Sequence, residues 1–133
     1  MKKIVVSGSM AFFSEMEAAA NALSAMGFAP IIPREDDWDK IPPKKINQYK
    51  GEVSKRYFGE IANEETFAVF VVNEPKNGVH NYIGANTFAE IAIAFFFDKK
   101  IFLLNDVYAP FSDELLGWGA VSLKGDLAKI KEA

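Results

Sequence analysis

The feature that most constrains the fold of this chain is residues 66–73, a near-continuous run of β-branched and aromatic residues, Thr-Phe-Ala-Val-Phe-Val-Val-Asn. An apolar run without polar alternation is typical of a parallel strand that is buried on both faces. Such a strand needs helices on both sides of its sheet. The run therefore predicts an α/β protein with this strand near the centre of a parallel sheet.

Strand and helix signals alternate along the rest of the chain. Residues 3–7 are a short β-rich run, and residues 14–17 (Ser-Glu-Met-Glu) have the capping-box pattern that begins a helix, with Phe13 as the staple residue. We expect this helix to end at Gly27 and a strand to follow at 28–32. A strand, a helix and a second strand joined by a tight turn are typical of the start of an open α/β sheet.

Further elements follow the same alternation. Polar, proline-broken residues 33–46 predict a loop, and Asn86 is expected to be the N-cap of a helix that reaches about residue 97. The remaining expected elements are helices at 47–62, 112–116 and 125–131 and a strand at 100–104. We therefore expect residues 1–133 to form a single domain, a doubly wound, flavodoxin-like or Rossmann-like three-layer sandwich with four or five parallel strands.

Composition removes several classes of function. The chain has 133 residues and no cysteine, which excludes disulfides, cysteine zinc sites and cysteine nucleophiles. A net charge of −3 and a pI near 5.2 argue against a nucleic-acid partner, which normally needs a basic face. Residues 1–6 could begin a secretory signal, but Ser-Gly-Ser at 7–9 interrupts the apolar run, and no stretch approaches the roughly 20 apolar residues of a membrane span. We expect a cytoplasmic protein without a membrane partner.

Open α/β sheets bind ligands outside the carboxyl ends of their strands, which indicates the loops at 7–13, 73–86 and 105–110. Near this edge, Glu90 is the only residue between Lys76 and Asp98 that is certainly charged at neutral pH. A carboxylate in so apolar a helix is either exposed to solvent or faces a cleft, where a nucleophile or general base belongs. Its isolation favours the functional interpretation.

The Ser-Gly-Ser sequence at residues 7–9 precedes a helix and could place N–H groups and hydroxyls around an anion such as a 5′-phosphate. A tight turn without a ligand explains it equally well. The acids Glu35, Asp36, Asp37 and Asp39 lack calcium-loop spacing and are interpreted as a solvated loop, so we expect no metal site and no cofactor. His80, the only histidine, is expected to be a loop residue.

The stretch after the central strand resembles the nucleoside 2-deoxyribosyltransferase superfamily, which includes the 2′-deoxynucleoside 5′-phosphate N-hydrolases. Its members show Gly-Thr-x-x-Glu-x-Gly-x-Ala ahead of a Gly-Lys-Pro turn and an apolar strand. The matching residues here are Thr87, Glu90, Ala94 and Lys99, with the strand at 101–104. The first strand with its Gly-Ser turn and the strand at 68–73 are similar too, so the resemblance covers nearly the whole chain.

The resemblance implies cleavage of an N-glycosidic bond in a nucleoside or nucleotide, with Glu90 as the nucleophile and a covalent glycosyl intermediate that passes to water or to another base. It implies substrate-binding roles for Ser7, Gly8, Ser9, Asn86, Thr87 and Asn105. It also implies a homo-oligomer, dimer or larger, which the apolar surface on nearly every side of residues 91–97 independently favours.

The chain departs from the family pattern at its acids. Gly84 stands where an acid is usual, Phe67 replaces the usual aspartate at the start of the strand, and a common tyrosine of the first loop is absent. A general acid for the leaving base is therefore not evident. The alternatives are a non-catalytic nucleotide-binding module with the same fold and a phosphoribohydrolase of the cytokinin-activating type, although the arginine-bearing, double-glycine motif of the latter is missing.

Overall fold

The structure is a computed structural model that describes residues 2–35 and 38–132, and its centre is a five-stranded sheet in the order β2-β1-β3-β4-β5. All neighbouring strands are parallel. The strands are β1 (Lys3–Ser7), β2 (Ala29–Ile31), β3 (Thr66–Val71), β4 (Lys100–Leu103) and β5 (Val121–Ser122). This order is that of flavodoxin-like sheets, so the expected doubly wound α/β fold is confirmed.

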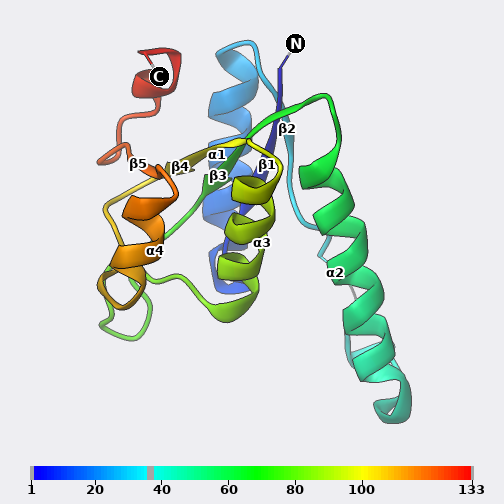
Figure 1. The fold of residues 1–133 in the computed structure, drawn as a ribbon. Coiled ribbons are helices and arrows are strands. Elements are labelled where there is room, and N and C mark those ends of the chain that lie inside the picture. Colours follow the sequence, from blue (N-terminus) through cyan, green and yellow to red (C-terminus); the bar gives the residue numbers. More distant parts are fainter. Residues whose placement is uncertain (1, 36–37, 133) are drawn as a thin grey trace.

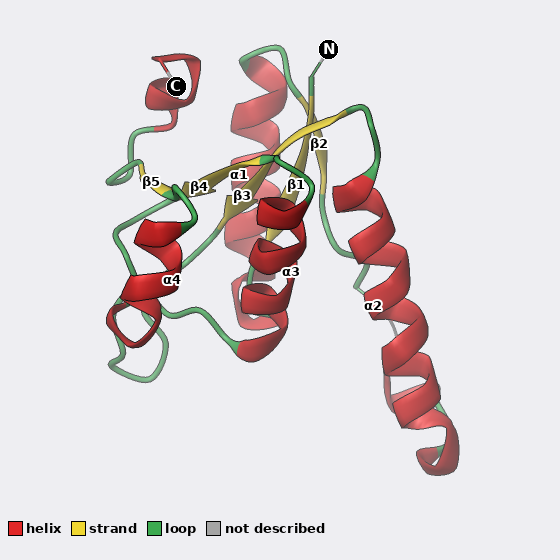
Figure 2. Cartoon of the chain, viewed as in Figure 1, coloured by secondary structure: helices red, strands yellow, loops and turns green. Residues whose placement is uncertain are grey.

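Helices cover both faces of the sheet (Figures 1 and 2). They are α1 (Phe13–Ala25), α2 (Ile46–Ala62), α3 (Ala85–Phe96) and α4 (Ser112–Gly117). The side chains of β1 alternate between two cores. Ile4 and Val6 pack with α1, whereas Val5 packs with α2, α3 and α4.

Strand β3 lies between β1 and β4, as its apolar run predicts. Its residues 68–71 have no exposed surface. Burying a strand on both faces removes much of its apolar area from water, at about 25 cal/mol per Å². Because this burial holds the central strands in place, the carboxyl ends of β1 and β3 give firm support to the loops that follow them.

Two of the expected helix starts are wrong. A 3₁₀ turn at Met10–Phe12 leads directly into α1 at Phe13, so the chain is already helical where the capping box was expected. Ser9 caps this turn instead, and its Oγ accepts from the N–H of Ala11 at 3.3 Å. Because the 3₁₀ turn already supplies helical backbone before Ser14, residues 14–17 begin no helix.

Helix α3 begins at Ala85, with Gly84 as its N-cap, and not at Asn86. Asn86 therefore lies in the first turn, where its side chain contacts other side chains and does not cap the helix. The helix expected at 125–131 is a 3₁₀ helix at Leu127–Glu132. Asp36 and Asp37, two of the four loop acids, lie outside the described residues.

Candidate active site

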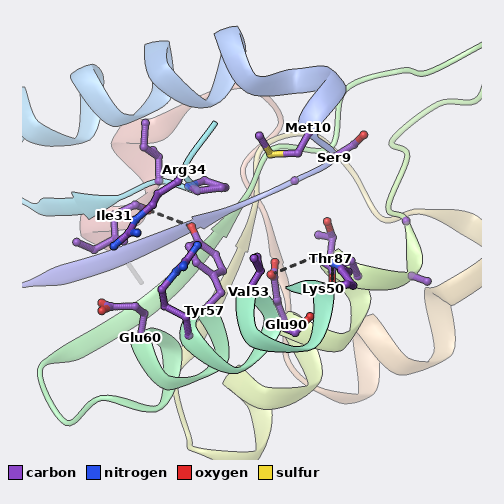
Figure 3. Close-up of a pocket in the computed structure, with 18 of the residues that line it drawn as sticks. Ser9, Met10, Ile31, Arg34, Lys50, Val53, Tyr57, Glu60, Thr87 and Glu90 are labelled. Atoms are coloured by element: carbon purple, nitrogen blue, oxygen red, sulfur yellow. Dashed lines mark hydrogen bonds between the residues drawn. The ribbon is translucent and has the colours of Figure 1, made fainter. Parts of the chain in front are cut away.

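A cavity of about 460 Å³ opens above the carboxyl end of β1, between the β1–α1 turn and helices α2 and α3 (Figure 3). Glu90, Thr87 and Lys50 are at one end of it in this view, Glu60 is at the other, and Tyr57 stands between them. The residues that line it and concern its chemistry are Gly8, Ser9, Lys50, Tyr57, Glu60, Tyr82, Gly84, Asn86, Thr87 and Glu90. This is the position at which open α/β sheets bind ligands.

Glu90 lies in the second turn of α3 and is 5% exposed. Burial raises the pKa of its carboxyl from the ordinary 4.5 to about 7, against the opposing effects of the Ser7 hydroxyl and of the Lys50 charge. The carboxyl therefore titrates close to neutral pH. A buried carboxyl that faces a cavity and titrates near neutrality is typical of functional sites.

Ser7 ends β1 beneath Glu90. Its Oγ is buried, and no described atom meets it with hydrogen-bond geometry. The effect of Ser7 on the pKa of Glu90 therefore comes from a contact that is weaker than a full hydrogen bond. A buried hydroxyl costs about 1–3 kcal/mol when it lacks a partner, and Ser7 is not among the residues that line the cavity.

Lys50 and Asn86 form a chain of hydrogen bonds at the rim of the cavity. Lys50 Nζ donates to Asn86 Oδ1 at 2.9 Å, and Asn86 Nδ2 donates to Glu90 Oε2 at 3.4 Å. Lys50 comes from α2, whereas Asn86 and Glu90 come from α3. The chain connects an ammonium group to the buried carboxylate.

Tyr57 forms part of the cavity wall and joins α2 to the sheet. Its hydroxyl donates to the carbonyl of Val6 and lies 3.3 Å from the carbonyl oxygen of Ile31. Burial first, and then the charges of Glu90 and Glu60, raise the pKa of Tyr57 well above its ordinary value. Tyr57 is therefore a neutral hydroxyl that holds α2 in place and is not a base.

The β1–α1 turn approaches the neighbouring strand too closely for a side chain. A Cβ at Gly8 would lie 3.0 Å from the carbonyl oxygen of Val72 and 3.4 Å from Sδ of Met16. The next residue, Ser9, faces the cavity, and its Oγ accepts from Lys76 Nζ at 3.3 Å. The Ser9 hydroxyl and the N–H groups at the start of a helical segment thus lie at the cavity, and Lys76 reaches Ser9 without itself lining the cavity.

The structure brings most of the expected site residues to one place. Those that line the cavity are Gly8, Ser9, Asn86, Thr87 and Glu90. Asn105 lies outside this lining, and its side-chain amide donates to Glu74 Oε1 at 2.6 Å and to the carbonyl of Asn73 at 3.1 Å. These bonds connect the segments that follow β3 and β4, and a role of Asn105 toward a ligand stays a prediction.

Tyr82 explains the glycine at position 84. A Cβ at Gly84 would lie 3.1 Å from the hydroxyl oxygen of Tyr82, so this phenol takes the space that a side chain at 84 would need. The Tyr82 ring also lies 5.0 Å from Lys76 Nζ. His80 lies in the same loop and is exposed, as expected.

Sequence reasoning missed Lys50 and Lys76. Lys50, Tyr57 and Glu60 lie on one side of α2 because residues seven and about ten apart share a helix face. The periodicity that predicts α2 could therefore have placed Lys50 and Glu60 beside Tyr57. Lys76 gave no such signal, because a tight turn between Lys76 and Val79 sets its position.

No group of three or more acidic or histidine side chains in the described ranges is arranged to hold a metal ion. Nor do these ranges contain a helix that is both long and apolar enough to cross a membrane.

Comparisons with known proteins find similarity among solved structures. No protein-family model and no curated protein matches the chain. Among solved structures, the CMP N-glycosidase BcmB of Clostridium botulinum is similar, with a TM-score of 0.59 and 17% sequence identity over 99% of this chain and 100% of that chain. At this identity the similarity shows the fold.

Proposed function

We propose that this protein cleaves the N-glycosidic bond of a nucleoside or nucleotide, with Glu90 as the nucleophile. The observation that carries the proposal is the position of Glu90, buried beneath a cavity at the carboxyl edge of the sheet and titrating near neutrality. The similar fold of a CMP N-glycosidase supports the same reaction class.

The reaction follows from the chemistry of a carboxylate beneath an anomeric carbon. The transition state resembles an oxocarbenium ion, which a nearby negative charge stabilises. A Glu90 oxygen bonds to C1′ while the C1′–N bond breaks, and the base leaves with the electron pair and takes a proton from solvent. Water then attacks C1′ and gives up a proton to solvent, the bond from C1′ to Glu90 breaks, and the carboxylate returns with the free sugar as product, so that one water is consumed in total.

The other expected residues bind the substrate in this proposal. Ser9 and Lys76, with the N–H groups after Gly8, suit a 5′-phosphate, because hydroxyl, ammonium and helix N-terminal donors all favour an anion. Thr87 and Asn86 stand beside Glu90 and suit the sugar hydroxyls. Ser7 is buried and does not line the cavity, so its expected role toward the substrate stays a prediction.

The second candidate function is nucleotide binding without catalysis, and it is favoured by the lack of an evident proton donor among the carboxylates of the cavity. Among the described residues that line the cavity, Glu60 is the carboxylate besides Glu90, and it pairs with Lys3 at 2.7 Å. Glycosidases of the retaining type normally place a second carboxyl about 5 Å from the nucleophile to protonate the leaving group. If no other group protonates the leaving base, the protein binds a nucleotide without cleaving it.

Release of free base distinguishes the two candidates. Ribonucleosides, deoxyribonucleosides and their 5′-monophosphates are incubated with wild-type protein, Glu90→Gln and Glu17→Gln, and free base is measured by chromatography. We expect release by the wild type and by Glu17→Gln, which changes an exposed glutamate on α1, and a loss of at least about a thousandfold in Glu90→Gln.

Equal release by Glu90→Gln and the wild type would contradict the proposal. If the wild type releases no base but a nucleotide raises its melting temperature, the binding-module function is supported instead.

A further inference from the structure

Lys50 and Glu90 come from two helices that pack together and are joined through Asn86. Asn86 and Glu90 are four residues apart on α3, so their side chains lie on one face of the helix. Lys50 and Asn86 are exposed, whereas Glu90 is buried. The buried carboxylate is thus connected to a charge at the protein surface through one amide.

The chemistry of the three groups gives this chain of hydrogen bonds one favourable direction. An ammonium group only donates and an ionised carboxylate only accepts, whereas an amide does both. Asn86 therefore satisfies both neighbours only with its oxygen toward Lys50 and its nitrogen toward Glu90, which is the arrangement observed. Protonation of Glu90 on the oxygen that faces Asn86 would place a donor against a donor.

Other titratable or charged groups also face Glu90 or its cavity. They are Arg34 from the loop after β2, Arg56, Tyr57 and Glu60 from α2, and Tyr82 from the loop after β3. Tyr57 donates to backbone carbonyls, and Glu60 pairs with Lys3. Lys50 is the cation whose charge lowers the pKa of Glu90 against the effect of burial.

Resting on the proposed function, we propose that Lys50 is a positioning residue that acts through Asn86, orienting the Glu90 carboxylate and favouring its ionised form.

Titration of Glu90 by NMR tests this without a substrate. Protein labelled with ¹³C at the glutamate carboxyls is titrated from about pH 4 to about pH 9, and the Glu90 signal is assigned by its loss in Glu90→Gln. We expect Lys50→Met and Asn86→Ala to raise the midpoint of Glu90 by about half a pH unit or more. Lys50→Arg, which keeps the charge, and Lys55→Met, which removes an exposed lysine elsewhere on α2, should leave it unchanged.

An unchanged midpoint in Lys50→Met would overturn the proposal. If that variant does not unfold cooperatively, Lys50→Gln is judged by the same criterion, since it keeps a polar side chain of similar length. Because the titration needs no catalysis, it decides the role of Lys50 even if no nucleotide is cleaved and the proposed function fails.

Kinetics give the second measurement. In Lys50→Met the rising limb of kcat/KM against pH should move with the NMR midpoint, while KM changes less than about twofold. Lys50→Arg should restore the wild-type profile. A large rise in KM with an unmoved limb would show that Lys50 binds the substrate directly and would overturn the positioning role.

Discussion

The burial of Glu90 makes stability depend on pH, because its pKa is near 7 in the folded protein and 4.5 is ordinary. A raised pKa means that the folded state binds the proton more tightly than the unfolded state does, so stability falls as pH rises from about 4.5 to about 7. Above that window the charged carboxylate costs up to about 3 kcal/mol.

Glu90→Gln should therefore stabilise the protein at pH values above 7 and lose this advantage near pH 4.5. Urea denaturation of the wild type and the variant at both pH values measures the difference. A variant that is equally stable or less stable above pH 7 would show that the charge is already compensated in the fold.

Activity should depend on pH in the opposite direction to stability, and rise with pH. In the proposed mechanism only the ionised carboxylate attacks C1′, so kcat/KM should rise about tenfold per pH unit below the Glu90 pKa of about 7 and level off above it. The profile is measured under substrate-limited conditions. Activity that falls as pH rises through 7 would mean that Glu90 works in its protonated form, as an acid.

At the scale of elements, the turn after β1 forms one wall of the cavity, and Gly8→Ala tests how tightly it is packed. The added methyl group would press on the carbonyl of Val72 at 3.0 Å, so we expect a loss of about 1–3 kcal/mol in the free energy of unfolding. Gly51→Ala is the matched control, because its new methyl group on α2 would meet no atom within 4 Å apart from its chain neighbours and the adjoining helix backbone. The control should gain up to about 1 kcal/mol from helix propensity. Equal effects of the two changes on stability would show that the turn can relax.

Sequence periodicity predicted the elements better than their ends. The apolar run of β3 identified the central strand, because a strand that is buried on both faces needs apolar residues at nearly every position. Asn86 suits an N-cap by residue type, yet it lies in the first turn of α3 and bonds to Lys50 and Glu90. The contact with Lys50 joins residues from different helices, and no local pattern encodes it. The same reason kept Lys50 out of the expected site, whereas the isolation of Glu90 among apolar residues was visible in the sequence.

At the scale of the whole molecule, an aromatic surface at the end of α3 is left uncovered in the single chain. Phe95, Phe96 and Phe97 are 44%, 77% and 45% exposed, and Leu116 on α4 is 65% exposed. Phe95 also stacks on Trp118 with ring centroids 5.3 Å apart. Exposed apolar surface of this kind marks interaction sites, and we propose that a second copy of the chain covers it.

Phe96→Glu should then convert an oligomer into a monomer of 14.8 kDa in sedimentation experiments, because it buries a charge in the contact. Lys55→Glu, on α2, serves as the control with the same introduced side chain. A wild-type protein that sediments as a monomer at every concentration would contradict the assembly.

Trapping the glycosyl intermediate tests the central claim most directly. A 2-fluoro-2-deoxy-arabinosyl analogue of the best substrate slows the second step, so the sugar should remain on the enzyme and be measured by intact mass and peptide mapping. We predict one adduct per chain, located on Glu90 and absent from Glu90→Gln. Base release with no adduct, or an adduct on another residue, would contradict the assignment of Glu90 as the nucleophile.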